Sequence, residues 1–297
     1  MDSVKAAIRE IGRQRPLLTL NLEVLRVTDL SFGFRRLTLR GREIDEYLDP
    51  LVADGFKVMI PPFDALDRKL EAPERDEQGL PIWQEHVEPR LRALTVRSLD
   101  RARQLMAVDV CTHSDGLLNR WLSVIAPGDN VSLSGMRVEW FLPAEIERLV
   151  LIADEAGVAA LAAIVESLPV DLMTTATQIL VPESTREYVE GIQAEVPKSA
   201  VTYLPNLTGS TANLITTGGC RTQVWIAAET AAVRSLRSTA KYEWNVDPRD
   251  LLARAYWHRT LNASAVDARD LERHRKALDE GADIHDPQLA EDLSLKD

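Results

Sequence analysis

The sequence predicts two consecutive domains of different class, an antiparallel β barrel followed by a doubly wound α/β domain. Length is the first observation, because 297 residues exceed what one hydrophobic core usually serves. The second is a change near Pro143, where short strand-like runs separated by Gly, Pro and Asp give way to apolar runs that alternate with helical patterns. We expect the barrel over residues 17–143, the α/β domain over 147–260 and an acidic, helical C-terminal tail over 261–297.

The predicted barrel begins with three strand-like runs, LLTLNLEVLRVTDL, FRRLTLRG and GFKVMIPP, which show no helical period. Residues 62–90 are polar and contain four prolines, so we expect a loop there. RALTVRSLD and QLMAVDVCTH resume strand character, and PGDNVSLSG predicts a turn and a further strand. Several short strands with such turn residues are typical of a small antiparallel barrel.

The predicted α/β domain begins with RLVLIAD, a short apolar run typical of a strand buried on both faces, and EAGVAALAAIVESLP follows with helical spacing. The runs VDLMTT, TQILVP, AVTYLP and TQVWIAAE, then TAAVRSLRSTAKYEW, continue the alternation, and LLARAYW is the expected last strand. In the tail, DARD and the later Gly281 predict one capped, solvated helix.

Composition excludes several classes of protein. The formal charge of −11 argues against a general nucleic-acid binder, and acidic residues interrupt the most apolar stretch, 149–170, so no membrane partner is expected. The two cysteines, Cys111 and Cys220, form neither a disulfide framework nor a zinc pattern, and the charged N-terminal segment has no apolar signal core. We expect a cytoplasmic protein, and the sequence leaves the oligomeric state open.

Acidic residues end two of the predicted parallel strands. Asp154 and Glu155 follow one apolar run, and Glu229 follows another. Ligands of open α/β sheets bind outside the carboxyl ends of the strands, so these carboxylates are candidate ligand contacts. The alternative is that they only stabilise the N-terminal ends of the helices that follow.

Common nucleotide and metal signatures are absent from the sequence. There is no GxGxxG fingerprint, no P-loop and no GxSxG elbow. The five histidines fall at no metal-ligand spacing, so no bound metal is expected.

Six stretches, in order along the chain, resemble motifs of the siderophore-interacting protein family. RALTVR resembles its R-x-Y-T-x-R flavin motif, HSDGLLNRW resembles H-G-x-x-G-P-A-S-x-W, and APGDNVSLSG resembles its A-P-G-D stretch. ADEAGVAAL resembles G-D-E-T-A-L-P-A, AAETAAVRSLR resembles A-G-E-x-x-x-x-R-x-x-R, and AYW resembles the terminal G-Y-W. The resemblance covers residues 20–260 and implies an FAD-binding barrel followed by an NAD(P)H-binding domain.

The resemblance implies roles for the strand RALTVR. By position, Arg92 lies near the FAD phosphates, Leu94 beside the flavin ring and Thr95 in hydrogen-bond reach of the ring system. An arginine fork suits a pyrophosphate because it binds two oxygens at once. Arg97 is equally suited to a surface ion pair.

The resemblance also implies that the turn after this part of the barrel holds the FAD pyrophosphate with backbone N–H groups at the start of a helix. The candidate residues there are His113, Gly116 and Asn119. Trp121 is expected to pack under the helix as core.

In the second domain, the resemblance implies NADH or NADPH as electron donor and assigns the cofactor contacts Asp154, Glu155, Glu229 and Trp257. The implied reaction is ferric-siderophore reduction, in which the pyridine nucleotide reduces FAD and the flavin delivers single electrons to Fe(III). An anionic ferric siderophore would need local positive charge. The candidates are Arg249, Arg254, His258 and Arg259, and the alternative is that these are ordinary surface charges.

The chain departs from the family pattern at positions that face the cofactors. Leu94 replaces a tyrosine, which removes aromatic stacking and predicts looser FAD binding. Alanine replaces glycine at three strand ends, where it narrows the approach of the backbone: Ala153, Ala228 and Ala255. Two other functions therefore stay open, a flavin reductase with another substrate and a non-enzymatic binding protein that has lost its flavin.

Overall fold

A computed structural model of the chain divides into two compact units, one formed by residues 17–50 and 54–137 and the other by 1–16, 51–53 and 138–297. The described residues are 3–15, 18–30, 33–62, 64, 66, 74–75, 81–82, 89–112, 116–192, 196–208, 211–215, 217–259, 269, 272–273, 276–277, 279–283 and 286–295.

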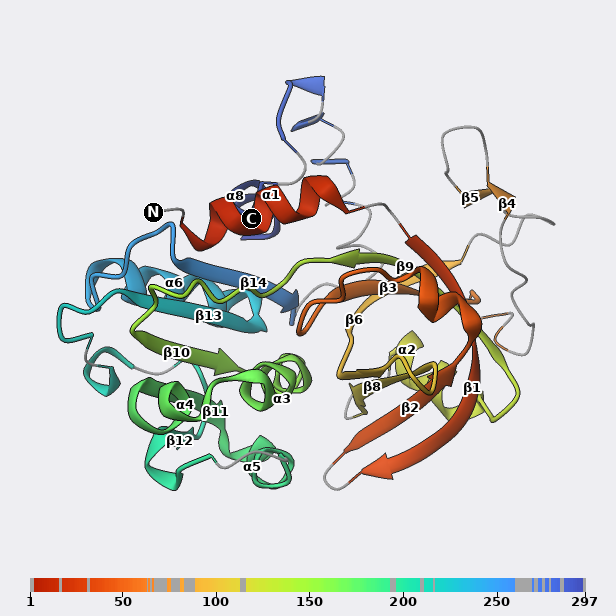
Figure 1. Ribbon diagram of the computed structural model, residues 1–297, viewed down its shortest axis with the longest axis horizontal. Helices are drawn as coiled ribbons and strands as arrows, with labels where there is room; N and C mark the ends of the chain where they lie inside the picture. Colours follow the sequence, from red (N-terminus) through yellow and green to blue (C-terminus); the bar gives the residue numbers. More distant parts are fainter. Residues whose placement is uncertain are drawn as a thin grey trace. The chain divides into compact units, whose positions relative to one another are not determined.

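The first unit is a curled antiparallel sheet of seven strands in the order β6-β3-β9-β1-β2-β8-β7 (Figure 1). The strands are β1 (Leu18–Leu30), β2 (Phe34–Arg40), β3 (Gly55–Ile60), β6 (Arg90–Thr95), β7 (Ser98–Asp100), β8 (Leu105–Cys111) and β9 (Asn130–Arg137).

The two edge strands of this sheet, β6 and β7, are consecutive in the chain and separated only by Val96 and Arg97. Consecutive Cα atoms lie about 3.8 Å apart, so the sheet must curl until its edges nearly meet. The backbone N–H of Arg97 donates to the carbonyl of Ala107 in β8 at 2.9 Å, which ties the edges together. The prediction of an antiparallel barrel is confirmed.

The barrel interior is filled by alternate residues of the strands, as a pleat requires. The segments between the strands add a short 3-10 helix, η1 (Arg42–Glu46), and the helix α2 (Leu117–Val124). A two-residue ladder, β4 (Glu74–Arg75) with β5 (Pro81–Ile82), lies within the stretch expected to be loop. Trp121 of α2 is buried in the barrel core, as predicted.

The second unit is built on five parallel strands in the order β12-β11-β10-β13-β14. They are β10 (Arg148–Ala153), β11 (Thr177–Pro182), β12 (Val201–Leu204), β13 (Thr222–Glu229) and β14 (Leu251–Trp257). The chain winds outward from β10 to β12, then returns to the other side of β10, which is the doubly wound order. The predicted fold class is confirmed, and all five carboxyl ends lie at one edge of the sheet.

The helices of this unit connect the strands. They are α3 (Val158–Ser167), α4 (Val170–Ala176), the 3-10 turn η4 (Glu183–Thr185) with α5 (Arg186–Glu190), and α6 (Thr230–Tyr242). Among the described residues no single helix is long and apolar enough to span a membrane. Only α3 and α4 together, bent by 118°, satisfy that criterion of length and composition, and α3 is largely buried in this unit.

Two terminal helices complete the second unit, and the sequence patterns do not predict the N-terminal one, whereas the C-terminal one lies within the tail expected to be helical, 261–297. Helix α1 (Val4–Gln14) contacts α8 (Pro287–Leu295), and both pack on β14 (Figure 1). Helix α8 also contacts α6, so the last described helix is part of a packed layer and not a solvated element. The helix predicted between Asp267 and Gly281 falls mostly outside the described residues.

Candidate functional site

Asp154 joins the carboxyl ends of three parallel strands. It follows β10 directly, and its Oδ2 accepts hydrogen bonds from the backbone N–H of Glu229 and the indole Nε1–H of Trp257, each at 2.7 Å. Its Oδ1 accepts from the N–H of Ala156 at 2.9 Å and of Gly157 at 3.3 Å. Asp154 is 5% exposed, so its contacts are with the ends of β13 and β14 and with the start of α3.

Trp257 is held at two points. Besides its indole bond to Asp154, its backbone carbonyl accepts a hydrogen bond from the hydroxyl of Thr230 at 3.0 Å. The residue is still 38% exposed. Trp257 is therefore an oriented aromatic ring with accessible surface at the edge of the sheet where ligands of this fold bind. Thr230 was not a predicted site residue, and no local pattern marks it.

Burial raises the pKa of Asp154 above its ordinary value, and the hydrogen bonds from Trp257, Glu229 and Ala156 oppose that shift. Because the pKa is raised overall, the loss of hydration of the charged carboxylate outweighs the stabilisation that it gains from these hydrogen-bond donors.

Glu229 caps the helix that follows it. Its Oε2 accepts from the N–H groups of Ala231 at 2.7 Å and Ala232 at 3.3 Å, and its Oε1 accepts from the N–H of Arg259 at 3.3 Å. These are the contacts of an N-cap, one of the two roles left open by the sequence. Glu229 is 7% exposed, and capping alone accounts for these contacts, so its contact with a cofactor stays a prediction.

We expect Glu229→Ala to lower the free energy of unfolding by about 1 kcal/mol, because an N-cap is lost. Glu229→Gln keeps one acceptor oxygen and should unfold within a few tenths of a kcal/mol of the wild type. Urea unfolding measures both. Slower reduction of bound flavin in Glu229→Gln, at unchanged stability, would instead place this side chain at the nucleotide.

Glu155, the neighbouring acid, points to a different element. Its Oε1 accepts a hydrogen bond from the hydroxyl of Ser184, which follows β11. Asp154 and Glu155 therefore diverge, the first toward β13 and β14 and the second toward β11.

Gly157 begins α3 where the helix passes close to β13. A Cβ at this position would lie 2.2 Å from the carbonyl oxygen of Ala227, closer than atoms can approach. Glycine is therefore required for the close contact of helix and strand. The glycine in ADEAGVAAL is the sequence signal for this close contact.

The three alanines at strand ends do not require unusual backbone geometry. None of them is among the residues with positive φ, and the methyl groups of Ala153 and Ala228 are fully buried. Both side chains are therefore packed inside this unit, and whether they crowd a nucleotide stays a prediction. Ala255 is half-buried.

In the barrel, strand β6 presents two of the three predicted FAD contacts on one face. Arg92 lies opposite Val58 and Leu94 opposite Phe56, and directly opposed residues share a face. Arg92 is half-buried, and Leu94 packs against the barrel core. Thr95 is buried and, by the alternation of a strand, lies on the other face from Leu94, and its contact with the flavin ring stays a prediction.

Arg97 is part of an internal ion-pair group. Its Nε lies 3.7 Å from Asp109 Oδ2, and Arg36 binds both oxygens of the same carboxylate at 2.6 and 2.7 Å. Arg97 is 8% exposed, so its ion pair is a buried one and not at the surface.

The start of α2 matches the predicted anion-binding turn in one respect. Gly116 is the N-cap residue, and among the described residues no side chain caps the helix. Asn119 lies in the first turn of α2, and His113 lies outside the described residues.

The four predicted substrate contacts do not form one site. Arg249 precedes β14 and pairs with Asp247 at 2.6 Å, whereas His258 and Arg259 follow the carboxyl end of this strand. Seven residues of strand separate these positions by roughly 23 Å. Arg254 does not fit the predicted role, because it is 6% exposed and its Nε lies 3.2 Å from the buried Glu139.

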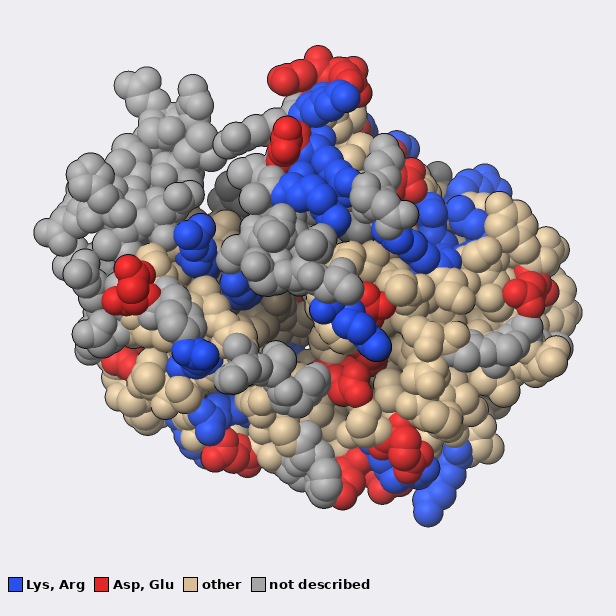
Figure 2. Space-filling model, turned by 180° about the vertical axis from the view of Figure 1, so that it is seen from behind, with Lys and Arg blue, Asp and Glu red and all other residues tan. Residues whose placement is uncertain are grey.

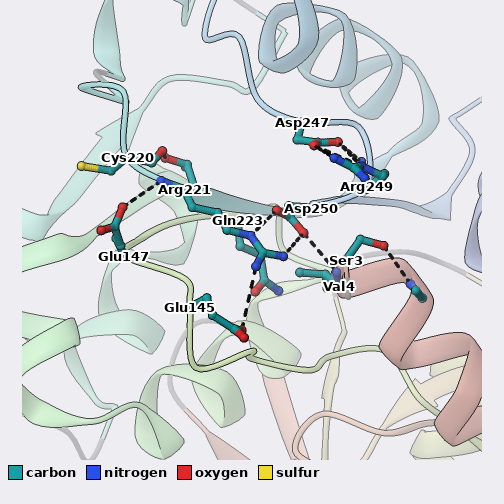
Figure 3. Close-up of polar contacts among 12 residues, drawn as sticks. Ser3, Val4, Glu145, Glu147, Cys220, Arg221, Gln223, Asp247, Arg249 and Asp250 are labelled. Atoms are coloured by element: carbon teal, nitrogen blue, oxygen red, sulfur yellow. Dashed lines mark hydrogen bonds and ion pairs between the residues drawn. The ribbon is translucent and has the colours of Figure 1, made fainter. Parts of the chain in front are cut away.

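A cavity of about 520 Å³ lies at the amino ends of β13 and β14, opposite the edge described above. Figure 3 shows that several of its charged groups are engaged with one another. Arg221 binds Asp250 through Nε at 2.8 Å and Nη2 at 3.1 Å, and Asp250 also accepts from the N–H of Val4 at 3.0 Å. These contacts attach the start of α1 to the start of β14, which is a structural role.

Within the described residues, no three His, Cys, Asp or Glu side chains are grouped so that they could hold a metal ion.

Comparison with known proteins gives matches to both units. Residues 23–140 match the family described as siderophore-interacting FAD-binding domain, and residues 146–260 match the family described as siderophore-interacting protein. The chain is similar to the NADPH-dependent ferric-chelate reductase of Escherichia coli (strain K12), with 26% identity over 251 residues, which are 80% of this chain and 92% of that protein.

Solved structures agree with the fold. A siderophore utilization protein from T. fusca is 27% identical with a TM-score of 0.67, covering 84% of this chain and 95% of the other. The siderophore-interacting protein SipS from Aeromonas hydrophila has a TM-score of 0.64 at 21% identity, covering 88% and 98%. The second likeness, at this identity, concerns the fold alone.

Proposed function

Because this chain belongs to the siderophore-interacting protein family, we propose that it is an FAD-dependent oxidoreductase that reduces Fe(III) bound by a siderophore, with NADH or NADPH as electron donor. The observation that carries the proposal is the succession of the two matched regions, 23–140 and 146–260, on a curled barrel and a doubly wound sheet. One unit would hold the flavin and the other the nucleotide.

The barrel residues fit an anionic dinucleotide. Gly116 is the N-cap of α2 and has no capping side chain of its own, and no other described residue caps the helix, so the partial positive charge of its N-terminus suits a phosphate. Arg92, half-buried on β6, adds a guanidinium suited to phosphate oxygens. When bound, FAD would supply the exchange between a two-electron donor and a one-electron acceptor.

The residues at the carboxyl edge of the parallel sheet fit an aromatic ligand. Trp257 is oriented by Asp154 and Thr230 and keeps exposed surface. Its role would be to position a nicotinamide or flavin ring by stacking.

An anionic ferric chelate needs local positive charge in a protein of net charge −11. Figure 2 shows one face on which lysine and arginine side chains gather in the upper part, with carboxylates both among them and elsewhere on the face. Of the four predicted residues, we retain His258 and Arg259 as candidates, because they follow β14 at the ligand-binding edge.

The first test is flavin binding. The purified protein should bind FAD more tightly than FMN, because the contacts assigned to Arg92 and Gly116 exist only with the pyrophosphate. Arg92→Ala should weaken FAD binding by about 1.5–3 kcal/mol, the range for a hydrogen bond to a charged group. Arg103→Ala, which removes an exposed arginine from a turn, is the matched control. Equal affinity for FAD and FMN would contradict the assignment.

The second test is turnover. NADH or NADPH should reduce the bound flavin, and ferric siderophore should reoxidise it with release of Fe(II), detected by an Fe(II)-specific chromophoric chelator. Flavin reduction without Fe(II) release would favour a reductase with another substrate. A protein that binds no flavin would be the non-enzymatic relative.

A further inference from the structure

A chain of polar contacts runs across the carboxyl ends of β10, β11 and β12. Glu155, after β10, accepts a hydrogen bond from Ser184, after β11. Next to Ser184, Glu183 binds Arg186, and Arg186 lies over the ring of Tyr203 in β12. This half of the sheet edge lies on the other side of β10 from Trp257.

The Arg186 guanidinium has a defined geometry. Its Nε and Nη2 bind the two oxygens of Glu183 at 2.6 and 2.8 Å, and its Nη1 lies 3.4 Å from Glu190. Its Cζ lies 3.8 Å from the centre of the Tyr203 ring. Ion pairs three and four residues apart on a surface contribute little to stability. Stacking on the ring of Tyr203, which belongs to β12, also fixes the plane of the Arg186 guanidinium.

In a doubly wound sheet, a dinucleotide lies across the carboxyl ends of the strands on both sides of the switch point. Trp257 is on the β13–β14 side, which leaves the β11–β12 side for the adenosine half. An acid after the second strand binds the ribose 2′-OH of NADH in such sheets, whereas an arginine accommodates the 2′-phosphate of NADPH. Glu183 follows β11, the second strand of this sheet, and holds the neighbouring arginine.

Local charge distinguishes the two nucleotides. In the described segments after β11 and β12, residues 183–192 and 205–208, the acids Glu183, Glu187 and Glu190 outnumber the single cation, Arg186. The Arg186 guanidinium holds the pKa of Glu183 below its ordinary value, so this carboxylate stays ionised. The 2′-phosphate of NADPH would place roughly two further negative charges at this position.

We propose that Glu183 selects NADH over NADPH, with Arg186 and Tyr203 as a stacked platform for adenine and the Glu183 carboxylate as acceptor for the ribose 2′-OH. This inference rests on the proposed function, because it concerns the electron donor of that reaction. The guanidinium face away from Tyr203 is the stacking surface, and Arg186 is 41% exposed. The preference differs from the one in the name of the Escherichia coli relative.

The test compares the rate of flavin reduction with the two nucleotides. The wild type should show a kcat/KM for NADH at least about tenfold above that for NADPH, which corresponds to about 1.4 kcal/mol. Glu183→Gln should raise kcat/KM for NADPH severalfold, mainly through KM, because the contact is remote from the reacting ring. Glu187→Gln removes the same charge from the same segment outside the Arg186 fork, so it measures the effect of local charge alone and should change the ratio clearly less than Glu183→Gln does.

A binding measurement separates this inference from the proposed function. By calorimetry, 5′-AMP should bind the wild type more tightly than 2′,5′-ADP, and Glu183→Gln should reduce that difference. Equal use of both nucleotides, a preference for NADPH, or a Glu183→Gln ratio equal to that of Glu187→Gln would overturn the inference while the reductase function stands. If neither NADH nor NADPH reduces the flavin, the proposed function fails. The inference is then decided by the binding of 5′-AMP and 2′,5′-ADP alone.

Discussion

Glu291→Met is expected to lower the free energy of unfolding by about 3–5 kcal/mol, the cost of removing one partner from a buried ion pair. Glu291, in α8, is fully buried, and its Oε2 lies 2.8 Å from Nζ of Lys5 in α1. Its Oε1 accepts a hydrogen bond from the N–H of Ala253 in β14 at 3.1 Å. The Nε of Arg237 in α6 lies 3.6 Å from Oε2. The substitution therefore leaves several buried groups without their acceptor.

Urea unfolding of the variant measures this loss of stability. Two further variants serve as controls that show whether the loss comes from the buried ion pair. Lys5→Met combined with Glu291→Met should recover part of the loss, because the uncompensated ammonium is removed with its partner. Glu23→Gln breaks an exposed pair with Arg40 and should cost at most about 1 kcal/mol. A loss for Glu291→Met no larger than that of Glu23→Gln would contradict the structural role of the cluster.

The effect should depend on pH in a defined direction. Burial lowers the pKa of Lys5 below 10.5, and Glu291 opposes that shift. A lysine with a lowered pKa in the folded state favours folding above its unfolded pKa and loses that contribution as pH falls. The penalty of Glu291→Met should therefore shrink as pH rises toward 10.5, where neutral Lys5 no longer needs a partner.

The packing of the terminal helices illustrates what the sequence could not predict. Both lie outside the matched regions 23–140 and 146–260, and neither has a motif. From the sequence alone, Lys5 is expected to be a solvent-exposed charge. In the structure it binds Glu291 of α8, which is 286 positions away in the chain. The charge pattern of a helix indicates which residues prefer water, but burial of a paired charge depends on a tertiary partner.

The strand ends show the opposite case. The apolar run RLVLIAD located the end of β10 and placed Asp154 at the ligand-binding edge, because the run length and the helical pattern after it leave little freedom. The same reasoning predicts that Glu229 ends β13 at this edge, where it could contact a ligand or cap the next helix. What stayed hidden was the partner of each carboxylate, since Trp257 lies 103 positions from Asp154.

The motif RALTVR was interpretable only in part for the same reason. The strand pattern and the family resemblance place Arg92 and Leu94 on β6, and the pleat puts them on one face. That Leu94 packs against the barrel core, and that Thr95 faces away, follow from the pairing of β6 with β3. Pairing partners are not encoded locally, so the sequence could not fix them.

Asp154→Ala is expected to lower the free energy of unfolding by about 3 kcal/mol and to release Trp257. Four donors lose their acceptor, and each buried donor left unsatisfied costs about 1–3 kcal/mol, reduced where water enters the space. Asp154→Asn retains one acceptor oxygen and should lose less. Urea unfolding gives the stability. The indole N–H signal of Trp257, assigned in a nitrogen–proton spectrum by its absence in Trp257→Phe, reports the contact directly.

Glu155→Gln is the matched control, because it changes the adjacent carboxylate, which contacts Ser184 and not Trp257. It should leave the indole signal in place. Because burial raises the folded-state pKa of Asp154 above 3.8, the stability that this group contributes is greatest below the unfolded pKa and falls as pH rises through the folded value. The stability of the wild type relative to Asp154→Asn should therefore decrease as pH rises through the acid range. An Asp154→Ala variant with wild-type unfolding and an unmoved indole signal would show that Trp257 is oriented by its packing and not by this carboxylate.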